Sequence, residues 1–301
     1  MVQPADPPSP PPEVLADTLS SGWSRVYTDV NEFFFDIFFG TDQTGYCSGR
    51  KILKSNDGGV NWMKVSDSPR VWNIAAWGSQ KAAFLNNAPT SLQTQNGGLT
   101  FNSIIANPSL GPGFTDGWYI NSDTCIYLSA RVIWRSVDGG ISADSIHDFS
   151  DSPAFGLLFF LPDGRTGWAS REYGTFKTTD GGDNWSRVSS RFAFQHYISP
   201  TVGFMSKGIT IYKSLDGGIT FSAIYTHSEG NHLLGSSNDI QFLNENVGFC
   251  AIGNHILKTV NGGSTWEVVV RSGGRSIHEI HFTDEDHGWA ITAQTILRFA
   301  Q

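Results

Sequence analysis

Short apolar segments recur along the chain, each followed by a polar turn and a second apolar segment that opens on glycine and an aromatic residue. Clear examples are FFFDIFFGTDQTGYCSG (33–49), LLFFLPDGRTGWAS (157–170) and DIQFLNENVGFCAIG (239–253). Apolar runs this short, bounded by turn residues and rich in aromatics, are typical of β-strands rather than helices. The pattern predicts an all-β protein built from hairpins.

A second motif, Ser/Thr-x-Asp/Asn-Gly-Gly-x-x-aromatic, follows most of these hairpins. It occurs as SNDGGVNW, TQNGGLTF, SVDGGISA, TTDGGDNW, SLDGGITF and TVNGGSTW, with Asp57, Asn96, Asp138, Asp180, Asp216 and Asn261 at its third position. The Asp or Asn side chain can accept hydrogen bonds from its own turn, and the glycines supply positive φ without a steric clash. We therefore interpret these six residues as structural turn residues and not as catalytic ones.

One strand enters each of these boxes and one leaves it, so a unit holds four strands in about 40 residues, which is the period of a propeller blade. A seventh unit begins within 276–299 without a box, while Trp23–Val26 repeats the WSRV of residues 185–188. We predict a seven-bladed β-propeller of four-stranded antiparallel blades. Its ring would be closed by an N-terminal strand around Trp23–Tyr27 that completes the C-terminal blade and leaves no free edge.

The first residues differ from the rest in composition. Six of the thirteen prolines lie in residues 2–13, which favours an extended tether over a packed segment. We expect a tether at residues 1–19 and a single propeller at residues 20–301. We also expect an exported protein (periplasmic, lumenal or at a cell surface) whose signal sequence is absent from this chain, tethered to a membrane through its N-terminus. A cytoplasmic protein is the alternative.

Charge and cysteine content exclude several classes. The formal net charge of −8 argues against a nucleic-acid-binding protein, because such proteins are normally basic. No apolar run has the length of about 20 residues that a membrane-spanning helix needs. Three cysteines exclude a multi-cysteine zinc module, and no metal or cofactor motif is present. We expect no cofactor and no metal.

The six boxes resemble the Asp-box (BNR) repeat, and residues 22–299 resemble an Asp-box seven-bladed propeller. A TTDGGDNW box preceded by a Gly-Trp strand is most similar to the photosystem II stability/assembly-factor-like propellers, and more distantly to sialidase-type propellers. The resemblance to the first family implies a non-catalytic assembly protein of the thylakoid lumen or periplasm. The box itself is specific for the fold and much less so for function.

Topology separates the charged loops into two faces. Turns between the second and third strands of a blade lie on the same face as the connections between blades. The turns contribute arginines at positions 50, 131 and 171 to this face. The connections contribute arginines at positions 70, 191, 271 and 275. Guanidinium groups pair well with carboxylates and phosphates, and interfaces are rich in Arg and aromatic residues. The binding site is therefore predicted to contain Arg50, Arg70, Trp72, Arg131, Arg171, Tyr173, Arg191, Tyr197, Arg271 and Arg275.

The function favoured by these patterns is a non-catalytic binding or assembly module that recognises a protein or anionic partner. The alternative is a carbohydrate-active propeller, either a glycan binder or a sialidase-like or glycosidase-like hydrolase. Arg50, Arg131 and Arg171 could converge as a sialidase trio does, and Glu172–Tyr173 follows the last of them. However, the sialidase family also requires an Arg-Ile-Pro-like segment before the first blade, and this chain lacks one.

Overall fold

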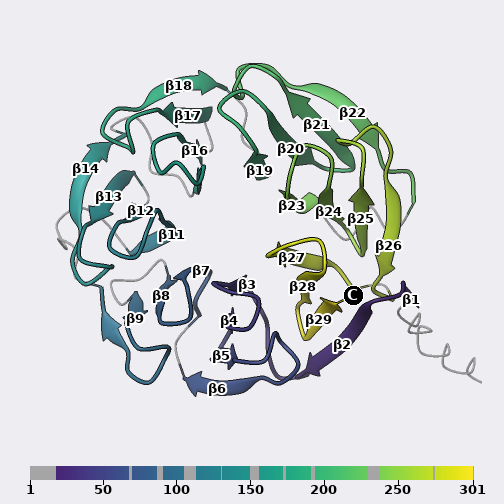
Figure 1. Cartoon of the computed structure of the whole chain (residues 1–301), viewed down its shortest axis with the longest axis horizontal. Helices are drawn as coiled ribbons and strands as arrows, with labels where there is room; N and C mark the ends of the chain where they lie inside the picture. The colour runs from purple at the N-terminus through teal and green to yellow at the C-terminus, as the bar shows by residue number, and fades with distance from the viewer. Residues whose placement is uncertain are drawn as a thin grey trace, which may run out of the picture.

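The computed structural model describes residues 18–67, 70–86, 91–104, 113–129, 131–149, 156–171, 174–190, 194–229, 237–273 and 275–300. The strands in these ranges form seven antiparallel sheets. Figure 1 shows the sheets arranged as a ring, with the first strand of each sheet nearest the centre. The predicted seven-bladed β-propeller is confirmed.

The first four blades follow one another directly in the sequence. Blade 1 contains β3 (Asp36–Phe39), β4 (Gly45–Ser48), β5 (Ile52–Ser55) and β6 (Met63–Ser66). Blade 2 contains β7 (Asn73–Trp77), β8 (Lys81–Leu85), β9 (Leu92–Thr94) and β10 (Asn102–Ser103). Blade 3 contains β11 (Phe114–Tyr119), β12 (Cys125–Ser129), β13 (Val132–Ser136) and β14 (Asp144–Asp148). Blade 4 contains β15 (Gly156–Phe160), β16 (Gly167–Arg171), β17 (Gly174–Thr178) and β18 (Ser186–Ser189).

The N-terminal segment takes part in the last two blades. Blade 5 contains β19 (Phe194–Tyr197), β20 (Gly203–Lys207), β21 (Thr210–Ser214) and β22 (Ser222–Thr226). Blade 6 contains β23 (Ser237–Phe242), β24 (Gly248–Ile252), β25 (His255–Thr259) and β26 (Glu267–Arg271). Blade 7 contains β27 (Ile277–Phe282), β28 (His287–Thr292), β29 (Thr295–Ala300) and the N-terminal strand β2 (Trp23–Thr28). β2 pairs with β29 in a register that sets Trp23 opposite Phe299. The predicted closure of the ring is therefore confirmed.

The last residues of the expected tether are already part of the ring. β1 (Thr18–Leu19) pairs with the outer strand β26 and adds a fifth strand to blade 6, so ordered structure begins before residue 20. Residues 1–17 lie outside the described residues. In the part of the chain that the structure describes, no helix is long and apolar enough to cross a membrane.

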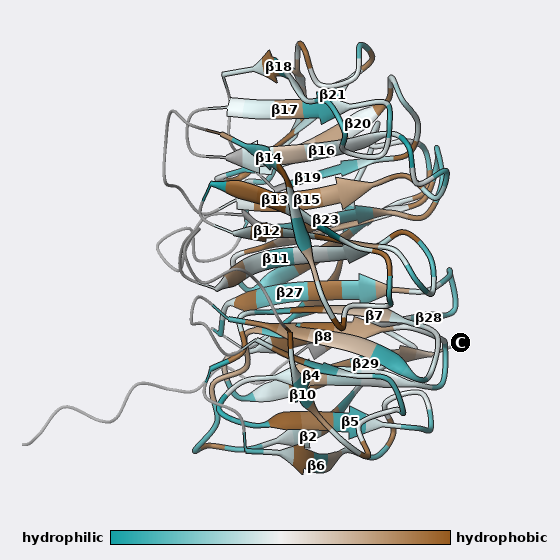
Figure 2. Ribbon diagram, turned by 90° about the vertical axis from the view of Figure 1, so that its left-hand side faces the viewer, coloured by the Kyte–Doolittle hydropathy of each residue, from teal (hydrophilic) through white to brown (hydrophobic). Residues whose placement is uncertain are grey.

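The disc has two faces, which Figure 2 shows from the side. β27 points toward the right of this view, so the right-hand face carries the turns after the first strand of each blade together with the box turns. We call it the box face. The left-hand face carries the turns between second and third strands and the connections between blades, and we call it the Arg-bearing face.

The core lies between neighbouring blades, where aromatic rings stack in pairs. Trp168 of blade 4 stacks on Tyr197 of blade 5 with ring centroids 3.6 Å apart. Phe204 of blade 5 stacks in the same way on Phe242 of blade 6, at 3.5 Å. Gly203 lies against the ring of Tyr197, where a Cβ would overlap it. The same close approach to a ring occurs at Gly45, Gly167, Gly248 and Gly288, and it explains the glycine before the aromatic residue in five of the seven second strands.

Candidate functional site

The box turns are held by a repeated hydrogen-bond network. In the fourth box, Thr178 Oγ1 donates to Asp180 Oδ1 at 2.8 Å, and the backbone N of Asn184 donates to the same oxygen at 2.9 Å. Hydrogen bonds from the backbone and side chain of Asn184 hold the pKa of Asp180 at about 2. A carboxylate held this way stays ionised as an acceptor, so it stabilises the turn and is unsuited to proton transfer.

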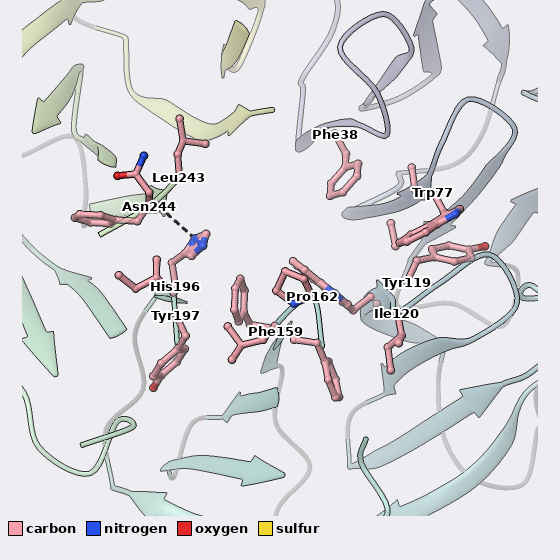
Figure 3. A pocket seen from close by; sticks show the side chains of 18 of the residues that line it. Phe38, Trp77, Tyr119, Ile120, Phe159, Pro162, His196, Tyr197, Leu243 and Asn244 are labelled. Carbon is pink, nitrogen blue, oxygen red and sulfur yellow. Dashed lines mark hydrogen bonds between the residues drawn. The ribbon is translucent and has the colours of Figure 1, made fainter. Parts of the chain in front are cut away.

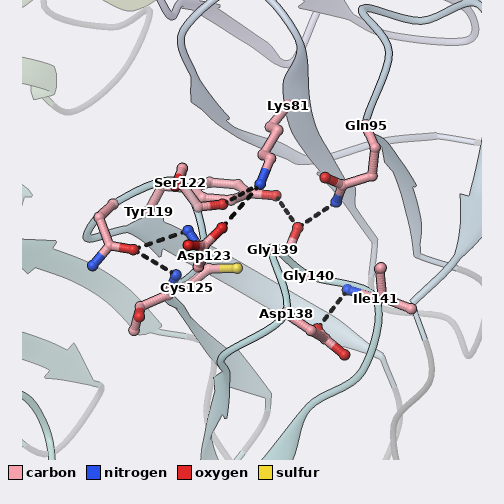
Figure 4. A network of polar contacts seen from close by, with 12 residues as sticks. Lys81, Gln95, Tyr119, Ser122, Asp123, Cys125, Asp138, Gly139, Gly140 and Ile141 are labelled. Carbon is pink, nitrogen blue, oxygen red and sulfur yellow. Dashed lines mark hydrogen bonds and ion pairs between the residues drawn. The ribbon is translucent and has the colours of Figure 1, made fainter.

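Each network also directs a carbonyl toward the preceding blade. Arg135 of blade 3 donates to Gly181 O at 2.7 Å, and Arg298 of blade 7 donates to Gly58 O at 2.7 Å. In Figure 4, Gln95 of blade 2 donates to Gly139 O of blade 3, at 2.5 Å. The box therefore connects neighbouring blades through the carbonyl of its first glycine.

The described arginines of the predicted site are distributed around the Arg-bearing face. Arg131 pairs with Asp148 at 3.3 Å, and Arg271 pairs with Glu229 at 2.8 Å. Arg275 donates to Thr295 Oγ1 at 3.2 Å. Arg50 and Arg70 are exposed, and neither forms an ion pair with any described residue. Among the described arginines of the predicted site, Arg50 and Arg70 are thus the two whose side chains have neither an ion pair nor a hydrogen bond to a described residue.

Tyr197 does not belong to the predicted site. It ends β19 on the side of the box face and is only 1% exposed. Its hydroxyl donates to Gln195 Oε1 at 2.6 Å, and its ring stacks on Trp168. The prediction assigned Tyr197 to the Arg-bearing face, but its place at the end of an inner strand brings it to the box-face side, between blades. Tyr173, Arg191 and the side chain of Arg171 lie outside the described residues.

A row of aromatic rings lies beside the two unpaired arginines. Trp72 is 49% exposed and contacts Phe35 with centroids 4.4 Å apart. Phe33, 43% exposed, contacts Phe35 at 5.1 Å and His278 at 5.7 Å. We call Phe33, Phe35, Trp72 and His278 the aromatic row. It joins the starts of blades 7, 1 and 2 at the inner edge of the Arg-bearing face.

Backbone contacts tie the arginines to this row. Glu32, which precedes Phe33, is buried, and its Oε1 accepts the backbone N–H groups of Phe33 and Arg50, at 3.1 and 2.6 Å. Arg70 lies two residues before Trp72, whose backbone N donates to Leu85 O at 2.8 Å. Arg50 thus shares a backbone hydrogen-bond partner with Phe33, and Arg70 lies two residues before Trp72 in the sequence.

The channel through the ring contains polar side chains at one level of the inner strands. Asp36, Asn73, Asp116, Asp239 and Glu279 occupy equivalent positions in five blades and line a cavity of about 360 Å³. We call these five residues the channel ring. Asp36 Oδ2 accepts a hydrogen bond from the backbone N of Ile74 at 2.5 Å. Asp116 Oδ2 accepts a hydrogen bond from the backbone N of Leu158, also at 2.5 Å. Asp239 Oδ2 likewise accepts a hydrogen bond from the backbone N of Ile280 at 3.2 Å, so these three carboxyls link their blades to the next one.

Burial raises the pKa values of the carboxyl groups in the channel ring. The pKa of Asp36 rises to about 7, with a further contribution from the charge of Asp239, and the pKa of Asp116 also rises to about 7. The pKa of Glu279 lies well above its ordinary value, through burial and through the nearby Asp239. Among the described residues, no three His, Cys, Asp or Glu side chains are placed to hold a metal ion.

A second and larger cavity opens at the box-face end of the channel. Its volume is about 630 Å³, and its lining includes Phe38, Trp77, Trp118, Phe159 and Leu243. Figure 3 shows rings from several blades turned toward this space. His196 also lines it and accepts the backbone N of Phe242 at 3.4 Å. Burial lowers the pKa of His196 to about 4, so the imidazole is neutral at physiological pH. We call this space the mouth cavity.

The sequence-based prediction included Trp72 but missed the other members of the aromatic row, the channel ring and the mouth cavity. A signal for the channel ring exists: an acid stands three residues before the last aromatic residue of four inner strands, in DIFF, DGWY, DIQF and EIHF. No comparable signal marks the mouth cavity, because its walls come from residues that also pack between blades.

Comparison with known proteins supports the fold. No protein-family model matches the sequence, and no curated protein matches it. A structure of YCF48 bound to D1 peptide aligns with a TM-score of 0.77 and 16% identity, covering 95% of this chain and 99% of that one. YCF48 from Cyanidioschyzon merolae aligns with a TM-score of 0.73 and 17% identity, over 93% and 99% of the two chains.

An enzyme also shares the fold. The GH74 xyloglucanase from Xanthomonas campestris aligns with a TM-score of 0.66 and 12% identity, covering 92% of this chain but only 44% of the enzyme. The predicted similarity to assembly-factor-like propellers is confirmed at the level of the fold, which is what identities this low establish.

Proposed function

We propose that this chain is a non-catalytic module that binds an acidic segment of a partner protein at the Arg-bearing face, centred on Arg50, Arg70 and the aromatic row. The observation that carries the proposal is the half-exposed aromatic row beside two arginines that no described carboxylate neutralises. Aromatic and Arg side chains supply much of the energy at protein interfaces. The structural likeness to YCF48 bound to D1 peptide supports a peptide as the ligand.

The pairing of the other arginines narrows the proposed site. Arg131 and Arg271 already contact Asp148 and Glu229, so binding a partner's carboxylate there would break an existing ion pair. Arg50 and Arg70 need no such exchange. A partner segment would lay its apolar side chains on Trp72 and Phe33 and direct its carboxylates to these two guanidinium groups, which can each form bidentate hydrogen bonds.

A glycan is the second candidate ligand, because exposed aromatic rings also stack on sugars and a xyloglucanase shares the fold. A glycosidase needs an acid and a second carboxylate about 5–10 Å apart with room for substrate between them. Asp36, Asp116 and Asp239 of the channel ring instead accept backbone hydrogen bonds between blades, and Glu279 hydrogen-bonds directly to Asp239. If the site takes a sugar, we therefore expect binding without hydrolysis.

The test measures fluorescence anisotropy with three labelled peptides that share the same aromatic residues and carry acidic, neutral or basic residues between them. A D1 peptide and xyloglucan oligosaccharides complete the panel. We expect the acidic peptide to bind most tightly and Arg50→Glu with Arg70→Glu to weaken it at least about tenfold, since each reversal replaces attraction by repulsion. Arg25→Glu with Arg165→Glu, two exposed arginines away from the row, is the matched control.

Three results would overturn the proposal. One is equal affinity for acidic and basic peptides. Another is an equal loss in the test and control variants. The third is saturable binding of the oligosaccharides in place of the acidic peptide, which would favour the glycan-binding alternative.

A further inference from the structure

The mouth cavity lies at the end of the channel away from the aromatic row, and nothing in the proposed function uses it. It is formed where the inner strands end, so its walls belong to the backbone framework of the ring. Trp77 closes one side and is 43% exposed, while Phe159 and Leu243 come from other blades. Its volume of about 630 Å³ lies within the range of ligand sites, about 300–1,000 Å³.

The turns around this cavity are strongly acidic. They follow the inner strands directly, at 40–44, 78–80, 120–124, 161–166, 198–202, 243–247 and 283–286, and Arg165 is their only cation. Their carboxylates are Asp42, Asp123, Asp163, Glu245, Asp284, Glu285 and Asp286, all exposed. Five of the seven turns therefore carry at least one carboxylate, and the turns at 78–80 and 198–202 carry none.

Three basic side chains near the box face form hydrogen bonds to backbone carbonyls. Lys177 donates to Pro200 O at 2.6 Å, and Arg298 donates to Gly58 O at 2.7 Å. Lys81 donates to Ser122 O at 2.6 Å and contacts Asp123 at 3.3 Å. These cations are held by backbone carbonyls of neighbouring blades, and of the three only Lys81 contacts one of the seven carboxylates. Glu245 and Asp286 have no ion pair among the described residues.

The inner end of the cavity leads toward further carboxyl groups. Phe38, Trp118, Phe159 and His196 line both the mouth cavity and the channel cavity of about 360 Å³. The second of these contains the channel ring, with Asp36, Asp239 and Glu279 among its members. An apolar passage thus connects an acidic rim with an acidic interior.

We infer that the mouth cavity is a second binding site, which takes an extended segment of a partner protein carrying a large apolar side chain beside a lysine or arginine. The apolar side chain fills the space between Trp77, Phe159 and Leu243. The cation lies among the carboxylates of the rim, and the aliphatic part of a lysine suits the apolar passage behind it. Charge complementarity selects this ligand, because the carboxylates of the rim would repel an acidic segment.

The inference is independent of the proposed function, since the two sites lie on opposite faces and attract opposite charges. The test uses three labelled peptides of equal length, measured by anisotropy with the whole chain. The first contains Phe-Lys-Leu-Lys, the second replaces both lysines by glutamate, and the third keeps the lysines but replaces Phe and Leu by serine. Acetyl-phenylalanine amide serves as an uncharged competitor.

We expect only the first peptide to bind well, with the second and third each weaker by at least about tenfold. Glu245→Lys with Asp286→Lys should weaken the first peptide at least about tenfold. The matched control, Asp144→Lys with Glu267→Lys on outer strands, should change it less than about twofold because such distant exposed charges are screened. Trp77→Ser should also weaken it, and the charge pair remains decisive if that variant does not fold.

Equal binding of the lysine and glutamate peptides would overturn the inference, as would equal effects of the test and control pairs. Full displacement by acetyl-phenylalanine amide at a similar concentration would also overturn it, because the ligand would then be a small apolar molecule. Arg50→Glu with Arg70→Glu must leave this binding unchanged, which separates a failure here from a failure of the proposed function.

Discussion

Asp116 shows how a residue can serve the ring while being costly to bury. It is 4% exposed, and its two oxygens accept the backbone N–H groups of Gly117 and Leu158 at 2.7 and 2.5 Å. These bonds join blade 3 to blade 4, yet burial still raises the pKa of its carboxyl from 3.8 to about 7. The folded protein therefore holds a proton on Asp116 over a pH range in which the unfolded chain releases it.

This arrangement predicts how stability depends on pH. A folded-state pKa above the unfolded value gives stability that is complete below the unfolded pKa of 3.8 and is lost as pH rises through about 7. The free energy lost by one such carboxyl is on the order of 4 kcal/mol. Asp116→Asn cannot ionise and retains an oxygen that can accept the Leu158 N–H. Between pH 5 and pH 8, we expect the thermal unfolding midpoint of the Asp116→Asn variant to fall less than the midpoint of the unmodified protein.

Thermal unfolding followed by circular dichroism at several pH values makes the measurement. Asp144→Asn, on the exposed outer strand β14, is the control and should leave the pH dependence unchanged. Parallel curves for Asp116→Asn and the unmodified protein would show that Asp116 is ionised in the fold.

At the scale of the strand, the closure of the ring depends on β2. Trp23 is 7% exposed, and its ring contacts Phe282 at 6.0 Å and Phe299 at 5.3 Å, both in blade 7. Val26 and Tyr27 pack against the cluster that also contains Phe34 of the following segment. The N-terminal strand thus brings apolar contacts to both sides of blade 7.

Trp23→Ala should therefore destabilise the whole protein. Truncating a buried tryptophan typically costs about 3–5 kcal/mol in free energy of unfolding. Trp72 is half-exposed, so Trp72→Ala should lower the free energy of unfolding by about 1 kcal/mol or less, because it removes mainly one aromatic contact. Denaturant unfolding of the two variants makes the comparison. Equal losses would mean that β2 contributes no more to the ring than a surface side chain does.

The strand pattern of the sequence was sufficient to predict the blades, because each box marks a turn at the same place in its unit. Closure by β2 was also predictable, since WSRV at residues 23–26 repeats the outer-strand WSRV of blade 4. The inner strands were harder to interpret. Neighbouring blades cover both of their faces, so a strand such as DIFF shows no alternation, and the acidic residue that marks the channel is recognised only when inner strands of several blades are compared.

At the scale of the molecule, the sites depend on distances between loops of different blades, which no sequence pattern contains. Topology correctly assigns Arg50 and Arg131 to one face, but only the structure shows that Arg131 contacts Asp148 and Arg50 has no described acidic partner. Tyr197 was misplaced for a related reason: whether an aromatic residue begins or ends an inner strand decides which face it approaches. Topology likewise assigns the seven carboxylates of the acidic rim to the box face, but only the structure shows that their turns surround a cavity.

The two proposed sites make a joint prediction for the intact protein. They lie at opposite ends of the channel, on faces that the side view separates by the full length of the strands. The acidic aromatic peptide and the lysine peptide should therefore bind at the same time, each with an affinity that the other changes less than about twofold, because charges so far apart are screened at physiological ionic strength. Anisotropy of one labelled peptide in the presence of a saturating amount of the other measures this.

Mutual displacement of the peptides would mean that both bind a single site, and it would contradict the assignment of opposite charge to the two faces. Raising the salt concentration should weaken both peptides, since each relies on charge complementarity. The variants distinguish the sites further, since Arg50→Glu with Arg70→Glu should abolish only the first binding and Glu245→Lys with Asp286→Lys only the second. A protein with these properties would hold two partner segments of opposite charge on one rigid ring, as an assembly module requires.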